Sequence, residues 1–294
     1  MPSNPTHDSR PLTSNAVKAA LLVSIVLGLT AGTAKSTAMA STREIGDSKA
    51  IALPSSANAR DAHIQILTQK LALAKAQGAT DHQISSKWHL RRIPTKTVQG
   101  LNSQATSGSN MNVQAPELWY DDTAHNYAIT ANWGWYKKAW KKDVPIAWLV
   151  RKPKNVGGED AFAIAFQEEI SNKGGAMAIC GARIKKYYDL PKCWQTNNVM
   201  TNNPNGEAIA FQDKGAWNTA KSYVTNADRG SYVFAFDWKK NVACNYIWSA
   251  YGHDWSKTTL SSIGIDGLNI VINFSNGTRH WNKVSPVVQT SGCP

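Results

Sequence analysis

The sequence predicts an all-β fold, an antiparallel β-sandwich or barrel of roughly 8–10 short strands that follows a helical pre-region. Hydrophobic residues alternate with small or polar residues at a period of two in several short runs. Clusters of Asn, Asp, Gly and Pro separate these runs at short intervals. Together these two observations indicate many short strands in a sandwich or barrel.

The N-terminus has the pattern of a secretory signal peptide. An uncharged apolar run spans residues 19–29, Arg10 and Lys18 precede it, and an Ala-Met-Ala sequence follows at residues 38–40. The run is shorter than the roughly 20 apolar residues that a membrane span needs. We therefore expect residues 1–40 to be removed during export, so that the protein is secreted and extracellular. An uncleaved membrane anchor is the alternative.

Residues 41–112 form a pre-region whose composition differs from the rest, with a single Trp and no Cys, Phe or Tyr. A helix is predicted over 58–77, because apolar residues repeat there at the spacing of one helical face: Ile64, Leu67, Leu71 and Ala74. One amphipathic helix must dock on another element, and the following domain is the only candidate. The pre-region is either a propeptide, cut near Arg92 or within 102–112, or a plain spacer with an incidental helix.

Residues 113–294 are expected to form the β domain. The run Ala161–Phe166 alternates small and large residues, which indicates a strand with one face in a core and the other crowded. A similar run with aromatic residues covers 231–238. A β-branched run over 268–274 precedes Asn276-Gly277, a pair typical of hairpin turns. We expect 278–281 to return as the second strand of that hairpin.

Four cysteines lie in this domain: Cys180, Cys193, Cys244 and Cys293. In an exported protein they predict two disulfides. Four cysteines allow three connectivities, and the sequence cannot fix which one forms. Sequential pairing, Cys180 with Cys193 and Cys244 with Cys293, closes the shortest loops and is the preferred interpretation.

Charge and motifs exclude several function classes. The net charge of +12 is spread along the chain without a long basic block, so no nucleic-acid partner is expected. No nucleophile-elbow, zinc-protease or phosphate-loop motif is present, and no metal-ligand spacing or cofactor is predicted. The three histidines of the domain, His125, His253 and His280, are candidate catalytic residues only if a carboxylate or nucleophile converges on one of them.

The strongest functional feature is a set of aromatic and basic residues that we call the aromatic–lysine patch. Trp133 and Trp135 would share one face of a strand. Indole rings beside ammonium groups suit a sugar ring or a lipid–water interface. The patch comprises Trp133, Trp135, Lys137, Lys138, Trp140, Lys141 and Lys142.

The sequence thus predicts a secreted binding protein of the lectin, toxin or effector kind, which attaches to an extracellular carbohydrate or membrane surface. Two alternatives stay open. One is a secreted hydrolase made as a zymogen, in which the 58–77 helix covers the cleft, and the other is a secreted inhibitor. An enzyme would show a histidine and a carboxylate converging in a cleft, whereas a binding protein would show exposed indole rings.

Overall fold

A computed structural model describes residues 57–98, 110–136, 153–182, 190–217, 223–240, 244–255, 259–267, 269–275 and 280–291. The chain divides into two units, Met1–Asp47 and Ser48–Pro294, and the described residues all belong to the second. The predicted signal peptide therefore lies outside the described residues. Within the described part, no helix is long and apolar enough to cross a membrane.

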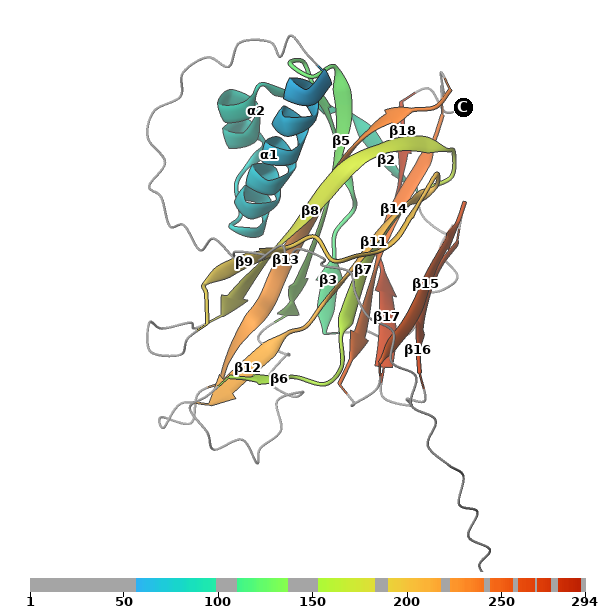
Figure 1. Cartoon of the computed structure of the whole chain (residues 1–294). Helices are drawn as coiled ribbons and strands as arrows, with labels where there is room; N and C mark the ends of the chain where they lie inside the picture. Colours follow the sequence, from blue (N-terminus) through green and yellow to red (C-terminus); the bar gives the residue numbers. More distant parts are fainter. Residues whose placement is uncertain are drawn as a thin grey trace, which may run out of the picture. The chain divides into compact units, whose positions relative to one another are not determined.

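The fold is all-β with a helical layer, as predicted, and two antiparallel sheets stack face to face (Figure 1). The described residues form eighteen strands, more than the roughly 8–10 predicted, because several strands have only two to five residues. We call the larger sheet sheet A. Its strands are β1 (Leu90–Ile93), β3 (Met111–Val113), β4 (Glu117–Asp121), β5 (Asn126–Trp135), β6 (Lys154–Asn155), β8 (Ile170–Ala182), β9 (Cys193–Thr196), β12 (Lys214–Trp217) and β13 (Tyr223–Trp238).

Sheet B packs against the inner face of sheet A, and a separate two-stranded hairpin covers the outer face of sheet B (Figure 1). The hairpin consists of β15 (Leu260–Asp266) and β16 (Asn269–Phe274). The strands of sheet B are β2 (Thr95–Val98), β7 (Asp160–Phe166), β10 (Val199–Asn203), β11 (Gly206–Phe211), β14 (Tyr246–Asp254), β17 (His280–Val284) and β18 (Val287–Thr290).

The alternation in β7 explains how sheet B is buried on both faces. Phe162, Ile164 and Phe166 enter the core between the sheets. The alanines between them face the hairpin, where Ile263 and Ile272 pack on them. Small residues on that face let the hairpin approach closely, so the large–small pattern is that of a strand between two layers.

One strand pairing differs from the sequence prediction. We expected 268–274 and 278–281 to form a hairpin across Asn276-Gly277, but β16 pairs with β15 and β17 pairs with β14 of sheet B. Residues 276–279 lie outside the described part. The local turn signal was outweighed by tertiary pairing, since β15 already provides β16 with an antiparallel partner.

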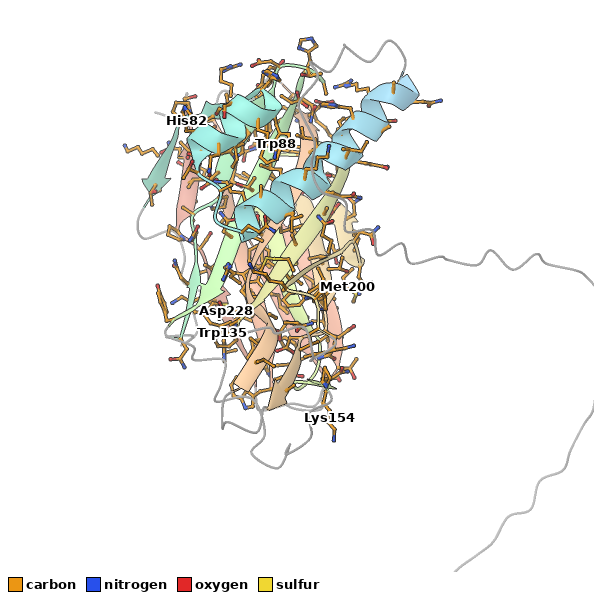
Figure 2. The ribbon with its side chains drawn as sticks, turned by 90° about the vertical axis from the view of Figure 1, so that its left-hand side faces the viewer. His82, Trp88, Trp135, Lys154, Met200 and Asp228 are labelled. Atoms are coloured by element: carbon orange, nitrogen blue, oxygen red, sulfur yellow. A yellow bond between two sulfur atoms is a disulfide. The ribbon has the colours of Figure 1, made fainter. Side chains whose placement is uncertain are left out.

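Two helices cover the outer face of sheet A, as Figures 1 and 2 show. The first, α1 (Ala57–Ala76), matches the predicted helix to within one residue at each end. Its apolar face, including Leu67 and Leu71, packs on Trp119, Ala178 and Val233 of the sheet. The second, α2 (Asp81–Trp88), was not predicted, because its eight residues carry one buried apolar side chain. A capping box between Thr80 and Gln83 defines its start.

Polar contacts also fix α1 to the sheet. The Lys75 ammonium, only 6% exposed, pairs with Glu117 of β4 and with Asp81 of α2. The Arg229 Nε–H of β13 donates to the carbonyl of Ala76, 2.8 Å away, at the end of the helix. Because these charged groups are partly buried, removing one partner would leave the other uncompensated.

The packing does not break at residue 113, where the sequence placed the start of the β domain. Strand β1 pairs with β4 in sheet A, and strand β2 pairs with β18 in sheet B. Only Pro94 separates β1 from β2, so this stretch steps from one sheet to the other. The predicted cleavage position at Arg92 lies inside a paired strand. Removal of residues 41–112 stays a prediction, but the helices of 57–88 pack on sheet A and the strands of 90–98 belong to the two sheets.

The predicted disulfide between Cys180 and Cys193 is confirmed, and the two residues lie directly opposite each other on β8 and β9. Cys244 is also disulfide-bonded. Its predicted partner, Cys293, lies outside the described residues.

Candidate functional site

The structure places the first residue of the aromatic–lysine patch in the core rather than on the surface. Trp133 and Trp135 share a face of β5, as predicted, but that face points toward sheet B. Trp133 is 2% exposed and stacks on Phe211 with ring centroids 5.7 Å apart. Gly230 lies opposite on β13, where a Cβ would come within 2.7 Å of the indole. The expectation of an exposed Trp133 is therefore corrected.

Trp135, near the end of β5, is half-buried. Its ring meets His253 and Trp281 edge-on, at centroid distances of 5.0 and 5.8 Å. The rest of the patch, namely Lys137, Lys138, Trp140, Lys141 and Lys142, lies outside the described residues. Their proposed binding role stays a prediction.

Of the three candidate histidines, His253 does meet a carboxylate, but inside the protein. His253 is fully buried, and its Nδ1 lies 2.8 Å from Oδ1 of Asp160. The Tyr251 hydroxyl and the backbone N–H of Asp254 donate to the same carboxylate. The partner is thus Asp160 of β7 and not the sequence neighbour Asp254. Because neither His253 nor Asp160 lines the cleft described below, we interpret this cluster as a hydrogen-bonded part of the core.

The other two histidines belong to the surface. His125 has a positive φ of 54° in the turn between β4 and β5. His280 is exposed and packs against the ring of Phe274.

A buried acid that the sequence did not single out lies at the start of β11. Glu207 is 1% exposed and accepts hydrogen bonds from the Tyr232 hydroxyl and the Asn172 amide. Desolvation raises the pKa of Glu207 above the ordinary value of 4.5, and the two hydrogen bonds partly oppose this shift. Gly175 makes room for the carboxylate, because a Cβ there would lie 2.9 Å from its Oε1.

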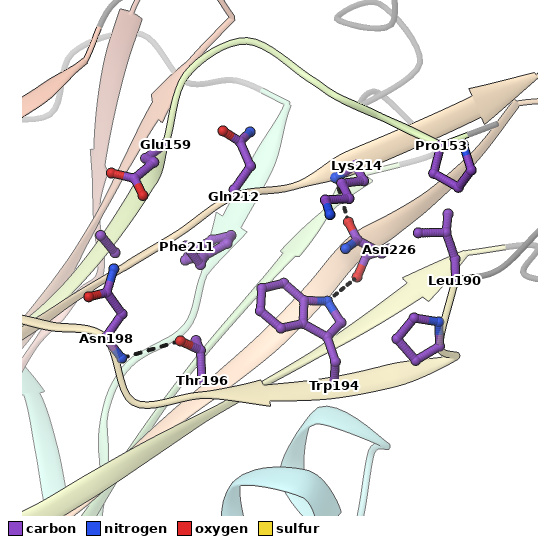
Figure 3. Close-up of a pocket in the computed structure, with 12 residues that line it drawn as sticks. Pro153, Glu159, Leu190, Trp194, Thr196, Asn198, Phe211, Gln212, Lys214 and Asn226 are labelled. Atoms are coloured by element: carbon purple, nitrogen blue, oxygen red, sulfur yellow. Dashed lines mark hydrogen bonds between the residues drawn. The ribbon is translucent and has the colours of Figure 1, made fainter. Parts of the chain in front are cut away.

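A candidate site lies in a cleft between β9 of sheet A and β11 of sheet B (Figure 3). Its volume is about 590 Å³, within the range typical of small-molecule sites. The lining residues are Pro153, Glu159, Leu190, Pro191, Trp194, Thr196, Asn198, Ala210, Phe211, Gln212, Lys214 and Asn226.

The floor of the cleft is aromatic. Trp194 projects from β9 and meets Phe211 edge-on, with ring centroids 6.4 Å apart. The Trp194 indole N–H donates to the carbonyl of Asn226 at 3.1 Å, and the Asn226 side chain in turn accepts from the backbone N–H of Lys214 at 2.6 Å. Figure 3 shows this chain of hydrogen bonds, which fixes the indole plane.

The rim of the cleft carries polar groups that are available to a ligand. The Gln212 Nε2 group donates to the carbonyl of Gly158 at 2.9 Å and has further protein acceptors nearby. Its Oε1 has no donor among the described residues. The side chains of Glu159, Asn198 and Lys214 likewise have no hydrogen-bond or ion-pair partner within the described part of the chain. The cleft thus combines an apolar floor with one carboxylate, one ammonium group and two side-chain amides at its rim.

No protein-family model matches the chain, and no curated protein is significantly similar to it in sequence. Its function has to be inferred from the site.

Few of the described residues that line the cleft are titratable. Glu159 is the one carboxylate among the described lining residues, and none of these residues is a histidine or a cysteine. Among the described residues, no group of three His, Cys, Asp or Glu side chains could hold a metal ion. The sequence did not reveal this site, because its residues come from β9, β11, β12, β13 and the segment before β7.

Proposed function

We propose that the protein is a secreted carbohydrate-binding protein that holds sugar rings in the cleft between β9 and β11. The observation that carries this proposal is the aromatic floor of Trp194 and Phe211 beneath a rim of unpaired polar side chains. A sugar ring has an apolar C–H face that can lie on an indole, and hydroxyls at its edge that can bond to amides and carboxylates. Secretion itself rests on the predicted signal peptide.

The polar rim argues against the other surfaces that the sequence left open. A lipid tail would leave the Glu159 carboxylate and the Gln212 Oε1 atom buried without partners, which is costly. A nucleic-acid backbone would meet one cation, Lys214, beside the Glu159 carboxylate. A neutral sugar satisfies both charges through its hydroxyls.

The hydrolase alternative lacks support in the cleft. Glycoside hydrolysis generally uses two carboxylates, roughly 5–10 Å apart, one on each side of the bond. Among the described lining residues Glu159 has no second carboxylate beside it, and the buried His253–Asp160 pair does not line the cleft.

A binding screen of the purified full chain tests the proposal. The probes are neutral hexasaccharides of glucose, xylose, mannose and N-acetylglucosamine, with neutral and anionic lipid vesicles in parallel. We expect saturable binding to at least one oligosaccharide. Binding to vesicles alone, or to no probe, would contradict the proposal.

A further inference from the structure

We infer that the Cys180–Cys193 disulfide positions Trp194, so that reduction by a dithiol weakens carbohydrate binding reversibly. This inference rests on the proposed function. It concerns β9, the strand that carries Trp194, and it states that the redox state of the disulfide on this strand controls ligand affinity.

Strand β9 is held weakly by its backbone. It has four residues, and among the described strands it pairs with β8 alone, at an edge of sheet A. Cys193 is its first residue and lies directly opposite Cys180, and Trp194 is the next residue along. A short edge strand with few ladder bonds opens easily, so a covalent link beside Trp194 contributes strongly to its position.

The two faces of β9 have different partners. Cys193 and Gln195 face the helical layer: Gln195 Nε2 donates to the carbonyl of Gln69 in α1 at 2.6 Å, and Gln77 Nε2 lies 4.0 Å from the Cys193 sulfur. Trp194 and Thr196 face the cleft. Contacts on the helix-facing side of β9 therefore help to fix the position of Trp194 on its cleft-facing side.

On the cleft side the indole N–H donates to the carbonyl of Asn226, its one hydrogen-bond partner among the described residues. Its other contact among aromatic rings is the edge of Phe211. Without the disulfide, the position of the ring would depend on the β8–β9 pairing, the Gln195–Gln69 hydrogen bond, the Asn226 hydrogen bond and the packing of the indole on the core. We expect the ring to sample several orientations and the ligand to lose its preformed floor.

The sulfur atoms differ in access. Cys180 is fully buried, whereas Cys193 is partly exposed. A cavity of about 520 Å³ between α1 and α2 is lined by Gln77, the residue that approaches the Cys193 sulfur. A thiolate of a dithiol reductant would attack Cys193 Sγ and release Cys180 as a thiolate. Its second thiolate would then displace Cys193, which yields two protein thiols and an oxidised reductant.

The test compares oxidised protein, dithiol-reduced protein and a C180A/C193A variant. Binding is titrated with the tightest hexasaccharide of the screen, while circular dichroism and thiol counts report fold and redox state. A C244A/C293A background confines reduction to the pair of interest. We expect at least a tenfold rise in Kd on reduction or in C180A/C193A, recovery on reoxidation, and an unchanged far-ultraviolet spectrum.

A matched control separates local from global effects. The variant I265A removes a buried side chain from the hairpin on the far side of sheet B, and it should lower Tm without raising Kd. Equal affinity of the oxidised and reduced forms would overturn the inference, and so would global unfolding on reduction. If the oxidised protein binds no oligosaccharide, the proposed function fails instead. The indole N–H resonance of Trp194, assigned with W194F, still tests the positioning, and an unchanged resonance on reduction would contradict it.

Discussion

At the scale of single residues, Glu207 shows how burial changes a side chain's chemistry. Desolvation raises its pKa in the folded protein, so the folded state keeps the proton to a higher pH than the unfolded chain does. Stability from this group is fully present below the ordinary carboxyl pKa and is lost as pH rises through the raised value.

We predict that E207Q reduces this pH dependence. The amide keeps the size of the side chain, can accept from Asn172 and can donate to the Tyr232 oxygen, but it has no charge to bury. The free energy of unfolding, measured with urea at pH 4 and pH 8, should fall less toward pH 8 in E207Q than in the wild type. Identical differences between the two pH values would show that Glu207 does not contribute.

The inward position of Trp133 gives a second residue-scale prediction. W133A should lower the free energy of unfolding by about 3–5 kcal/mol, the usual cost of removing a core Trp. W135A should cost less, because Trp135 is half-buried. Urea unfolding of both variants measures the difference. A near-zero loss in W133A would place that indole back on the surface.

At the scale of elements, the sequence was most informative where one pattern decides the outcome. The period of α1 and the alternation of β7 predicted both elements because each has a clear apolar face. Strands β1 and β2 were missed because Leu-Arg-Arg-Ile and Thr-Lys-Thr-Val are short and largely polar. Their partners β4 and β18 make them strands, and no local pattern reports such pairing.

Because β1 and β2 belong to different sheets, we predict that a cut after them leaves the molecule assembled. A specific protease site is introduced within residues 101–109, and the cleaved protein is examined by native size-exclusion chromatography. The two pieces should co-elute and separate only in denaturant, since α1, β1 and β2 stay packed. Uncleaved protein is the control. Dissociation on the native column would instead support a releasable propeptide.

At the scale of the whole molecule, the sandwich was predictable but the site was not. Alternation and turn clusters indicate a sandwich or barrel without fixing which strands are neighbours. The aromatic–lysine patch was predicted because its residues are close in sequence. Proximity in sequence does not show which face of a strand is buried, and the face of β5 that carries Trp133 belongs to the core. Trp194 and Gln212 are distant in sequence and meet only through the packing of the two sheets.

The most direct test of a carbohydrate-binding cleft is the affinity of W194A for the tightest hexasaccharide, compared with W88A. Trp88, at the end of α2, is a half-buried indole outside the cleft (Figure 2), so its loss controls for general effects of removing a Trp. We predict that W194A loses about 2 kcal/mol of binding free energy, roughly a 30-fold rise in Kd, while W88A binds like the wild type. Wild-type affinity in W194A, or an equal loss in W88A, would contradict the assignment of the cleft.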